Sequence, residues 1–316
     1  MLRAVRPSDG PEVARLLAAS IVRASDSDGW APAQLERTIA RLGRWDARAA
    51  MRVASGLGRP GPRSIVAEVD GRVRGVLVWT PGRQCAWVAA LAVGPAGPDG
   101  DVAGGLLQLA HRQARKAGLA ALLVPDACTE GGPEGPARWS GWGFAPVGEH
   151  ERWRCELRAS PGPPAAPGDG SVRPFRRRDT LRLIPAARAG RPAALEAFEP
   201  VVPSDLSVSP VVARALGSST RAWVHEGPRG PDAFVRATVS RATPEAHLAV
   251  IRDQAGSETG ANRLLTVALA WCRERGARTA VAGAVSGTPA ASLMAAAGFD
   301  LARRWTTWVR PVDGAG

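Results

Sequence analysis

Two ionisable side chains, Glu245 and His247, stand two residues apart in the C-terminal half of the chain. The segment 245–252 alternates with the period of a β-strand, so both side chains are expected on one side of a sheet. A carboxylate beside an imidazole is a workable proton acceptor near neutral pH. The structural alternative also stays open: Glu245 as the exposed start of a strand and His247 as a packed histidine.

A turn and a helix follow this strand. The turn, 253–260, contains Gly256 and Gly260, which are free to adopt positive φ, and helical periodicity then runs to a stop at Gly276. A strand that passes through such a turn into a helix presents unpaired backbone N–H groups at the positive end of the helix dipole. The sequence therefore predicts an anion-binding turn.

Length and composition bound the architecture. A chain of 316 residues favours two domains, and a hydrophobic content of 45% is ample for packed cores. No apolar run is long enough to span a membrane and the chain does not open with a signal-peptide core, so we expect a cytoplasmic protein. The four cysteines have no metal-ligand spacing, which suits a reducing compartment and predicts no metal site.

The net charge of +12 raises the alternative of a nucleic-acid or polyanion binder. We disfavour it, because Lys116 is the only lysine and the arginines occur together with abundant alanine, glycine and proline. A GC-rich coding bias produces that pattern. The positive charge is spread over both halves of the chain, and solvated arginines account for it.

The periodicities divide the chain into two series of elements. Asp70-Gly71, between alternating segments at 64–69 and 72–79, is a strong hairpin signal. Residues 159–170 are rich in proline and glycine and read as a linker. The other expected elements of the first series are strands at 2–7, 86–93, 119–124 and 151–157, with helices after Asp9, at 32–51 and at 102–117. In the second they are helices at 179–189, 208–216, 261–275 and 289–297, a hairpin at 221–240, and strands at 245–252, 278–283 and 300–309.

The second series repeats the first. Val5-Arg6-Pro7 recurs as Val172-Arg173-Pro174, the strand–turn–helix at 93–118 recurs at 251–276, and Gly143-Phe144 recurs as Gly298-Phe299. A repeat of this length indicates a duplicated domain. The predicted fold class is α/β (mixed α+β), with a domain at 1–158, a linker at 159–171 and a domain at 172–316. Each domain is expected to have a central mixed sheet flanked by helices.

The repeated strand–turn–helix resembles the acetyl-CoA motif of the GNAT acyltransferase superfamily, in its tandem-domain form. That motif is V-x-P followed by Q/R-x-x-G-x-G/A-x-x-L, and its backbone amides cradle the pyrophosphate. Its spacing is kept at 93–106 and at 251–264, while most signature residues differ. The resemblance implies acetyl-CoA, or another acyl-CoA, as co-substrate of the C-terminal copy. The residues expected to bind it are Ile251, Arg252, Gly256, Thr259, Gly260, Ala261, Asn262 and Arg263.

The first copy suits that ligand less well. Asp99 and Asp101 place negative charge where a pyrophosphate would approach, and Pro98 removes a backbone donor. Its strand carries Trp87 and Ala89 at the positions of the ionisable pair, and neither takes a proton. We therefore expect the N-terminal copy to be degenerate.

The resemblance also implies catalytic roles. Many GNAT enzymes use a glutamate on this strand as general base, which makes Glu245 and His247 the candidates. They often use a tyrosine on the last helix to protonate the CoA thiolate, but this chain has no tyrosine, and Met294 stands at the matching position. Ser286 and Ser292 are the nearby hydroxyls, and Ser286 is the expected substitute.

Three functions stay open at this point. The first is an N-acyltransferase whose C-terminal domain moves an acyl group from CoA to an amine by direct attack. The second is a non-catalytic GNAT-like protein that binds or scaffolds, and the third is the polyanion binder. The expected partners are an acyl-CoA and an unidentified amine acceptor, with no membrane association and a monomer or homodimer.

Overall fold

The computed structural model describes residues 1–24, 63–94, 101–126, 136–157, 171–202, 206, 218–240 and 244–312. The predicted helices at 32–51 and 208–216, the predicted linker up to residue 170, Cys128, Pro98 and Asp99 lie outside these ranges. The chain divides into two compact units. Unit 1 consists of Met1–Val147 with Trp305–Gly316, and unit 2 of Gly148–Arg304. No helix within the described ranges has the length and apolar character needed to cross a bilayer.

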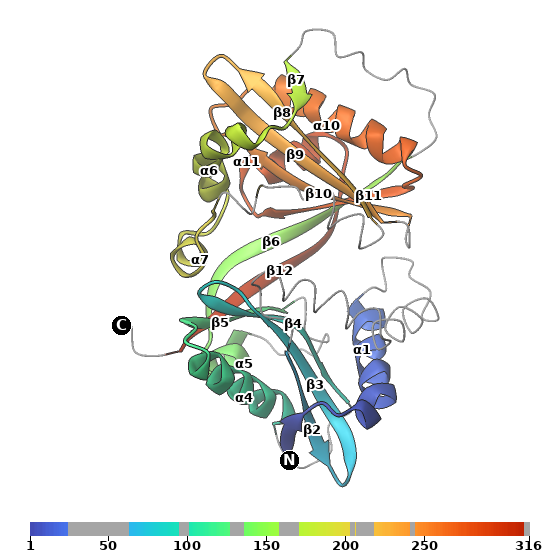
Figure 1. The fold of residues 1–316 in the computed structure, drawn as a ribbon, viewed down its shortest axis with the longest axis vertical. Coiled ribbons are helices and arrows are strands. Elements are labelled where there is room, and N and C mark those ends of the chain that lie inside the picture. Colours follow the sequence, from blue (N-terminus) through green and yellow to red (C-terminus); the bar gives the residue numbers. More distant parts are fainter. Residues whose placement is uncertain are drawn as a thin grey trace. The chain divides into compact units, whose positions relative to one another are not determined.

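Unit 1 is a mixed sheet with helices on both faces (Figure 1). Its strands in sheet order are β1 (Leu2–Ala4), β2 (Arg63–Val69), β3 (Arg72–Pro81), β4 (Cys85–Val93), β5 (Ala121–Pro125) and the end of β12 (Asp300–Pro311). Strands β4 and β5 are parallel, and the other pairs are antiparallel. The helical elements are η1 (Pro7–Asp9), α1 (Gly10–Ala24), α4 (Val102–Lys116) and α5 (Pro136–Gly141).

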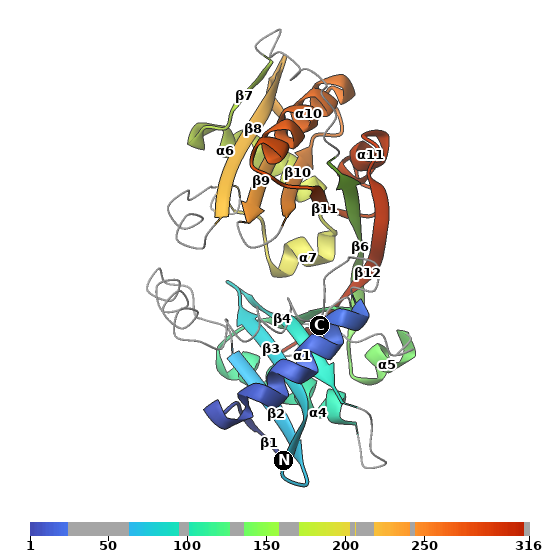
Figure 2. The same cartoon turned by 90° about the vertical axis from the view of Figure 1, so that its right-hand side faces the viewer.

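Alternation along the strands of unit 1 builds two apolar layers. Val66 and Val76 point to one face, where they pack with Leu16 of α1. Ile65 and Leu77 point to the other face and pack with α4. Figure 2 shows α1 crossing the strands of this sheet. The predicted hairpin is confirmed, since β2 and β3 join at Asp70-Gly71, where both residues have positive φ (50° and 71°).

Unit 2 repeats this plan. Its strands in sheet order are β6 (Ala145–Glu156), β11 (Thr279–Val285), β10 (Glu245–Arg252), β9 (Gly230–Ser240), β8 (Ser218–Gly227) and β7 (Val172–Pro174). The helical elements are η3 (Arg177–Asp179), α6 (Thr180–Ala189), α7 (Ala193–Phe198), α10 (Glu258–Glu274) and α11 (Pro289–Ala296). Strands β10 and β11 form its parallel pair.

The two faces of the unit 2 sheet are covered by different helices. One face carries Ala246 and Leu248 and packs with Leu264 of α10 and Leu293 of α11. The opposite face carries Phe234, which packs with Leu183 of α6. Figure 2 shows α10 lying over β8, β9 and β10. The face away from α10 is the one on which the candidate site lies.

The last strands are exchanged with respect to the expected domain limits. Strand β6 was expected to end the first domain, but from Gly148 onward it belongs to unit 2, where it pairs with β11. Strand β12 was expected to end the second domain, but from Trp305 onward it belongs to unit 1 and pairs with β5. Alternation identifies a strand without identifying its partner, and the last strands of duplicated domains are interchangeable.

Candidate active site

The parallel strands β10 and β11 pair over only part of their length. Their register runs from Glu245 opposite Thr279 to Ala249 opposite Gly283. Both strands then continue, β10 to Arg252 and β11 to Val285, beyond the last pair of that register. The strands therefore part after Ala249.

The equivalent strands of unit 1 part sooner. Cys85 of β4 lies opposite Ala121 of β5, and the register ends at Trp87 opposite Leu123. Strand β4 nevertheless continues to Val93. Both copies thus have a parallel pair that opens toward the start of the following helix.

Glu245 is the centre of a small polar cluster at the paired end of β10. Its Oε1 lies 3.3 Å from His247 Nε2 and 3.5 Å from Arg152 Nη2. The Glu245 side chain is only 10% exposed, whereas that of His247 is 60% exposed. The carboxylate is therefore buried, and the imidazole is the group of the pair that is accessible to an incoming molecule.

The strand register shows which residues share this face. His247 lies opposite Val281 of β11, which in turn lies opposite Arg154 of β6. On the other side, His247 lies opposite Thr238 of β9. Paired residues project from the same side of a sheet, so Arg154 and Thr238 belong to the face of Glu245 and His247. The face therefore carries ionisable and hydroxyl side chains beside the apolar patch that α6 covers.

The turn between β10 and α10 differs from its expected form. The amides of Gly256 and Gly260 were expected to be available, but Gly256 N donates to Asp253 O at 3.0 Å and Gly260 N donates to Ser257 Oγ at 3.0 Å. Ala255 N donates to Asp253 Oδ1 at 3.1 Å. Ser257 is the N-cap of α10, so the helix start is closed by its own side chain.

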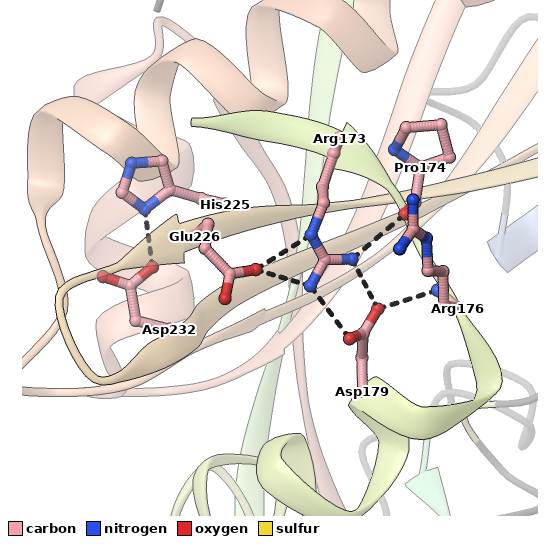
Figure 3. Close-up of polar contacts among 7 residues, drawn as sticks. All are labelled: Arg173, Pro174, Arg176, Asp179, His225, Glu226 and Asp232. Atoms are coloured by element: carbon pink, nitrogen blue, oxygen red, sulfur yellow. Dashed lines mark hydrogen bonds and ion pairs between the residues drawn. The ribbon is translucent and has the colours of Figure 1, made fainter. Parts of the chain in front are cut away.

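Asp232, at the start of β9, also reaches this turn. Its Oδ2 accepts a hydrogen bond from Ser257 N at 3.2 Å, and its Oδ1 lies 2.6 Å from His225 Nδ1 (Figure 3). The His225 ring packs against Gly260, where an added Cβ would stand 2.2 Å from ring atoms. Gly260 is therefore required for close packing, and the turn already holds a carboxylate.

The acyl arm and the diphosphate of an acyl-CoA would meet different surroundings in this region. Beyond Ala249, residues 250–252 and β11 are not joined in the register, so an extended acyl arm would lie along strand edges that do not pair with each other. A diphosphate fits the turn poorly. Gly256, Ser257 and Gly260 amides have internal partners, and the carboxylate of Asp232 repels an anion. Among the other expected ligands, Arg252 lies 3.7 Å from Glu258 through its Nη2.

The N-terminus of α4 in unit 1 is closed by a different carboxylate. Asp101 caps the helix by accepting from Gly104 N at 2.9 Å. It also accepts a hydrogen bond from Trp142 Nε1 and pairs with Arg138 at 3.3 Å. These donors hold the pKa of Asp101 below its usual value against the effect of burial. A negative charge therefore sits at this helix start, as the sequence indicated.

Ser286 does not join the Glu245 cluster. Its hydroxyl donates to Glu151 Oε1 at 2.9 Å, and Arg304 Nε donates to the same oxygen at 3.2 Å. Glu151 is opposite Ala284 in the register, so it projects to the α11 side of the sheet. This placement gives no support to the expected role of Ser286 as a proton donor.

Cys155 and Cys272 are not activated as nucleophiles. Burial raises the pKa of Cys272 to about 12. Burial also raises the pKa of Cys155, with Asp300 and Glu156 adding to the effect. A thiol with a raised pKa is protonated at neutral pH and attacks poorly.

An arginine cluster was not anticipated from the sequence. Arg173 binds Asp179 and Glu226 in unit 2 (Figure 3), and Arg3 binds Asp9 and Glu68 in the same way in unit 1. The signal was an arginine followed six residues later by an aspartate, as in Arg3 to Asp9 and Arg173 to Asp179. These contacts correct the expected repeat, because Arg173 corresponds to Arg3 and Val172-Arg173-Pro174 therefore matches Leu2-Arg3-Ala4 instead of Val5-Arg6-Pro7. The cluster is structural, and it shows the duplication at the level of single hydrogen bonds.

Solved structures of GNAT proteins match this fold over nearly the whole chain. A tandem GNAT protein from the clavulanic acid biosynthesis pathway matches with a TM-score of 0.60 and 17% identity, over 100% of this chain and 99% of that one. A GCN5-related N-acetyltransferase from Sphaerobacter thermophilus matches with a TM-score of 0.64 and 17% identity, over 99% and 95%. A glucosamine N-acetyltransferase region of a fungal multi-domain β-N-acetylglucosaminidase matches with a TM-score of 0.59 and 12% identity, over 98% of this chain and 38% of that one.

No protein-family model matches the sequence, and no curated protein does. The matches above confirm the predicted fold class: the chain has the GNAT fold in its tandem form, a mixed α/β architecture. At these identities the likeness establishes the fold, and the assignment of chemistry to residues rests on the site itself.

Proposed function

We propose that this protein is an acyl-CoA-dependent N-acyltransferase whose chemistry takes place in unit 2. The observation that carries the proposal is the Glu245–His247 pair on β10, with a buried carboxylate 3.3 Å from an exposed imidazole. A carboxylate in this position orients the imidazole. The tandem GNAT fold supports acyl transfer in general.

His247 is assigned the proton-accepting role and Glu245 the positioning role. An amine is protonated in water, and its nitrogen must lose a proton before its lone pair attacks a thioester carbonyl. His247 accepts that proton, the new C–N bond forms, and the C–S bond breaks with the electron pair leaving on the CoA sulfur. The remaining excess proton of the nitrogen passes to the departing thiolate, which gives an amide and the free CoA thiol. The raised pKa values of Cys155 and Cys272 favour this direct attack over a cysteine-bound intermediate.

Strand β4 of unit 1 carries no comparable pair. Trp87 and Ala89 of β4 stand where unit 2 has its ionisable pair, at the offset that relates the two copies. Asp101 caps α4 with a negative charge. Unit 1 is therefore proposed to support the fold without chemistry of its own.

The non-catalytic alternative is favoured by a specific observation. The amides of Gly256, Ser257 and Gly260 are engaged internally at the turn where the fold binds a diphosphate. A protein of this kind would keep the fold without binding acyl-CoA. The two proposals differ in what they predict for ligand binding.

The deciding experiment mixes the full chain with acetyl-CoA and longer acyl-CoAs against a panel of amines, and follows release of the free CoA thiol. The acyltransferase proposal expects amine-dependent thiol release. In parallel, binding of the same acyl-CoAs to the full chain is measured by calorimetric titration. Absence of both binding and release at millimolar acyl-CoA would favour the non-catalytic alternative.

A further inference from the structure

One carboxylate oxygen in unit 2, Oε1 of Glu245, has two nitrogen neighbours. His247 Nε2 lies 3.3 Å from it, and Arg152 Nη2 donates a hydrogen bond to it at 3.5 Å. The side chain of Glu245 is 10% exposed, against 35% for Arg152 and 60% for His247. The acid is therefore the most buried of the three groups, and its two basic neighbours lie nearer to the solvent.

Arg152 reaches this oxygen from two strands away. It lies on β6, Glu245 lies on β10, and β11 runs between them. Strand β6 belongs to unit 2 only through the exchange of the last strands. The guanidinium of the cluster thus comes from the part of the chain that precedes the predicted linker, whereas Glu245 and His247 follow it.

The guanidinium supplies a constant positive charge to the buried carboxylate. A guanidinium stays protonated in proteins, so Arg152 compensates Glu245 whether His247 is neutral or protonated. Removing one partner of a buried ion pair is unfavourable, because the desolvation of the remaining charge is no longer compensated. Without Arg152, the Glu245 side chain would turn toward water and lose its position beside His247.

The same contact decides which nitrogen of His247 can accept a proton. A neutral imidazole carries hydrogen on one ring nitrogen and a lone pair on the other. A lone pair on Nε2 would face the Glu245 oxygen at 3.3 Å and be repelled by it, whereas an N–H group there is attracted. Nε2 therefore carries the hydrogen of the neutral ring, and Nδ1 carries the lone pair.

We propose that Arg152 is a positioning residue. It holds Glu245 against His247, so that the imidazole keeps its hydrogen on Nε2 and accepts the proton of the amine at Nδ1. The electron pair of the broken N–H bond stays on the amine nitrogen, and the ring becomes an imidazolium with hydrogen on both nitrogens. It returns one proton to the solvent before the next turnover. The inference rests on the proposed function in assigning His247 as the acceptor of that proton.

Heteronuclear NMR of the His247 ring tests the inference without turnover. The full chain has four histidines, and His247→Gln identifies the signals of His247 by their loss. Long-range correlation of ring protons with ring nitrogens, in mildly alkaline solution, distinguishes the nitrogen that carries hydrogen from the one with the lone pair. The parent is expected to show the Nε2–H form. Arg152→Gln should move the two nitrogen signals toward each other, as in the tautomer mixture of a free imidazole, and Arg152→Lys should move them less.

Arg154→Gln is the matched control. Arg154 lies two residues from Arg152 on the same face of β6, but its side chain pairs with Glu156 at 3.2 Å. This variant should leave the His247 signals unchanged. An Nδ1–H form in the parent, or equal shifts in Arg152→Gln and Arg154→Gln, would overturn the inference. If Arg152→Gln does not fold, Arg152→Lys carries the test, and parent signals in that variant would overturn it as well.

Turnover separates this inference from the proposed function. On an amine that the parent acylates, Arg152→Gln should lower kcat about tenfold and leave the KM for acyl-CoA unchanged. In a Glu245→Gln background the same substitution should cause no further loss, because Arg152 acts through Glu245. A further tenfold loss there would overturn the positioning role. The expected NMR result without amine-dependent turnover would contradict the proposed function alone, and turnover with His247 signals unaffected by Arg152 would contradict only this inference.

Discussion

Arg173 donates hydrogen bonds to both carboxylate oxygens of Asp179, from Nη1 at 2.7 Å and from Nη2 at 2.9 Å. The same carboxylate accepts from Arg176 N at 2.7 Å, so it ties the end of β7 to the start of η3. Asp179 is buried, which makes the loss of its partner costly. Arg3 and Asp9 repeat this geometry in unit 1 at 2.6 and 2.9 Å.

Asp179→Asn is expected to destabilise the protein. The substitution removes the negative charge of the carboxylate to which both Nη1 and Nη2 of Arg173 donate. We expect the free energy of unfolding to fall by about 1–3 kcal/mol. Urea unfolding followed by tryptophan fluorescence measures it. Asp300→Asn is the control, because Asp300 is exposed and its loss should change stability by less than about 0.5 kcal/mol. Equal effects of the two variants would show that the Arg173 pair contributes no net stability.

The same pairs predict a loss of stability in acid. Hydrogen bonds from Arg3 lower the pKa of Asp9 from 3.8 to about 2, and those from Arg173 lower the pKa of Asp179. A lowered folded-state pKa gives stability that is complete above the ordinary value and is lost as the pH falls through the folded value. The parent should therefore lose stability from about pH 4 down to about pH 2. An Asp9→Asn and Asp179→Asn double variant should lose less over that window. Urea midpoints measured at successive pH values test this, and parallel curves would contradict it.

Gly260→Ala is expected to disturb the start of α10. Its Cβ would stand 2.2 Å from the ring of His225, which is itself held by Asp232 at 2.6 Å. Overpacking of this kind costs about 1–3 kcal/mol. The control is Gly10→Ala, where an added Cβ meets nothing within 4 Å. If Gly260→Ala unfolds at the same urea concentration as the parent, His225 does not hold the position it has in Figure 3.

Asp232→Asn tests whether the turn meets the diphosphate of CoA. The carboxylate of Asp232 stands at the helix start, and an approaching diphosphate would be repelled by it. Removing one like charge from a partly exposed site changes the free energy of binding by about 1 kcal/mol, so the affinity for acyl-CoA should rise roughly fivefold. Calorimetric titration of acetyl-CoA into both proteins measures the change. Unchanged or weaker binding would place the diphosphate away from this turn.

Much of the fold follows from local patterns in the sequence. The Asp70-Gly71 hairpin and the strand–turn–helix at 245–276 were predictable, because turn chemistry and periodicity act over a few residues. The exchange of β6 and β12 was not, because two similar last strands can join either sheet with the same alternation. The closed turn was not predictable either. Asp232 lies 25 residues before Ser257 and reaches it only because β9 and β10 pair side by side.

The candidate site was predictable in part. The Glu245–His247 proximity follows from their spacing on a strand, and the structure places them 3.3 Å apart. The contact of Glu245 with Arg152 spans 93 residues and depends on β6 joining unit 2. The contact of Ser286 with Glu151 spans 135 residues, and no local pattern indicates it.

The central claim is that His247 accepts the proton of the amine, and the turnover of His247→Ala tests it most directly. Rates of CoA thiol release are measured with saturating acyl-CoA and an acceptor on which the parent turns over, with Glu245→Gln assayed beside it. A positioned base contributes about two to four powers of ten in rate. His247→Ala should lose that factor, with Glu245→Gln losing less and acyl-CoA affinity unchanged in both. Turnover of His247→Ala at the parent rate would contradict the account and leave this pair as a structural feature of β10.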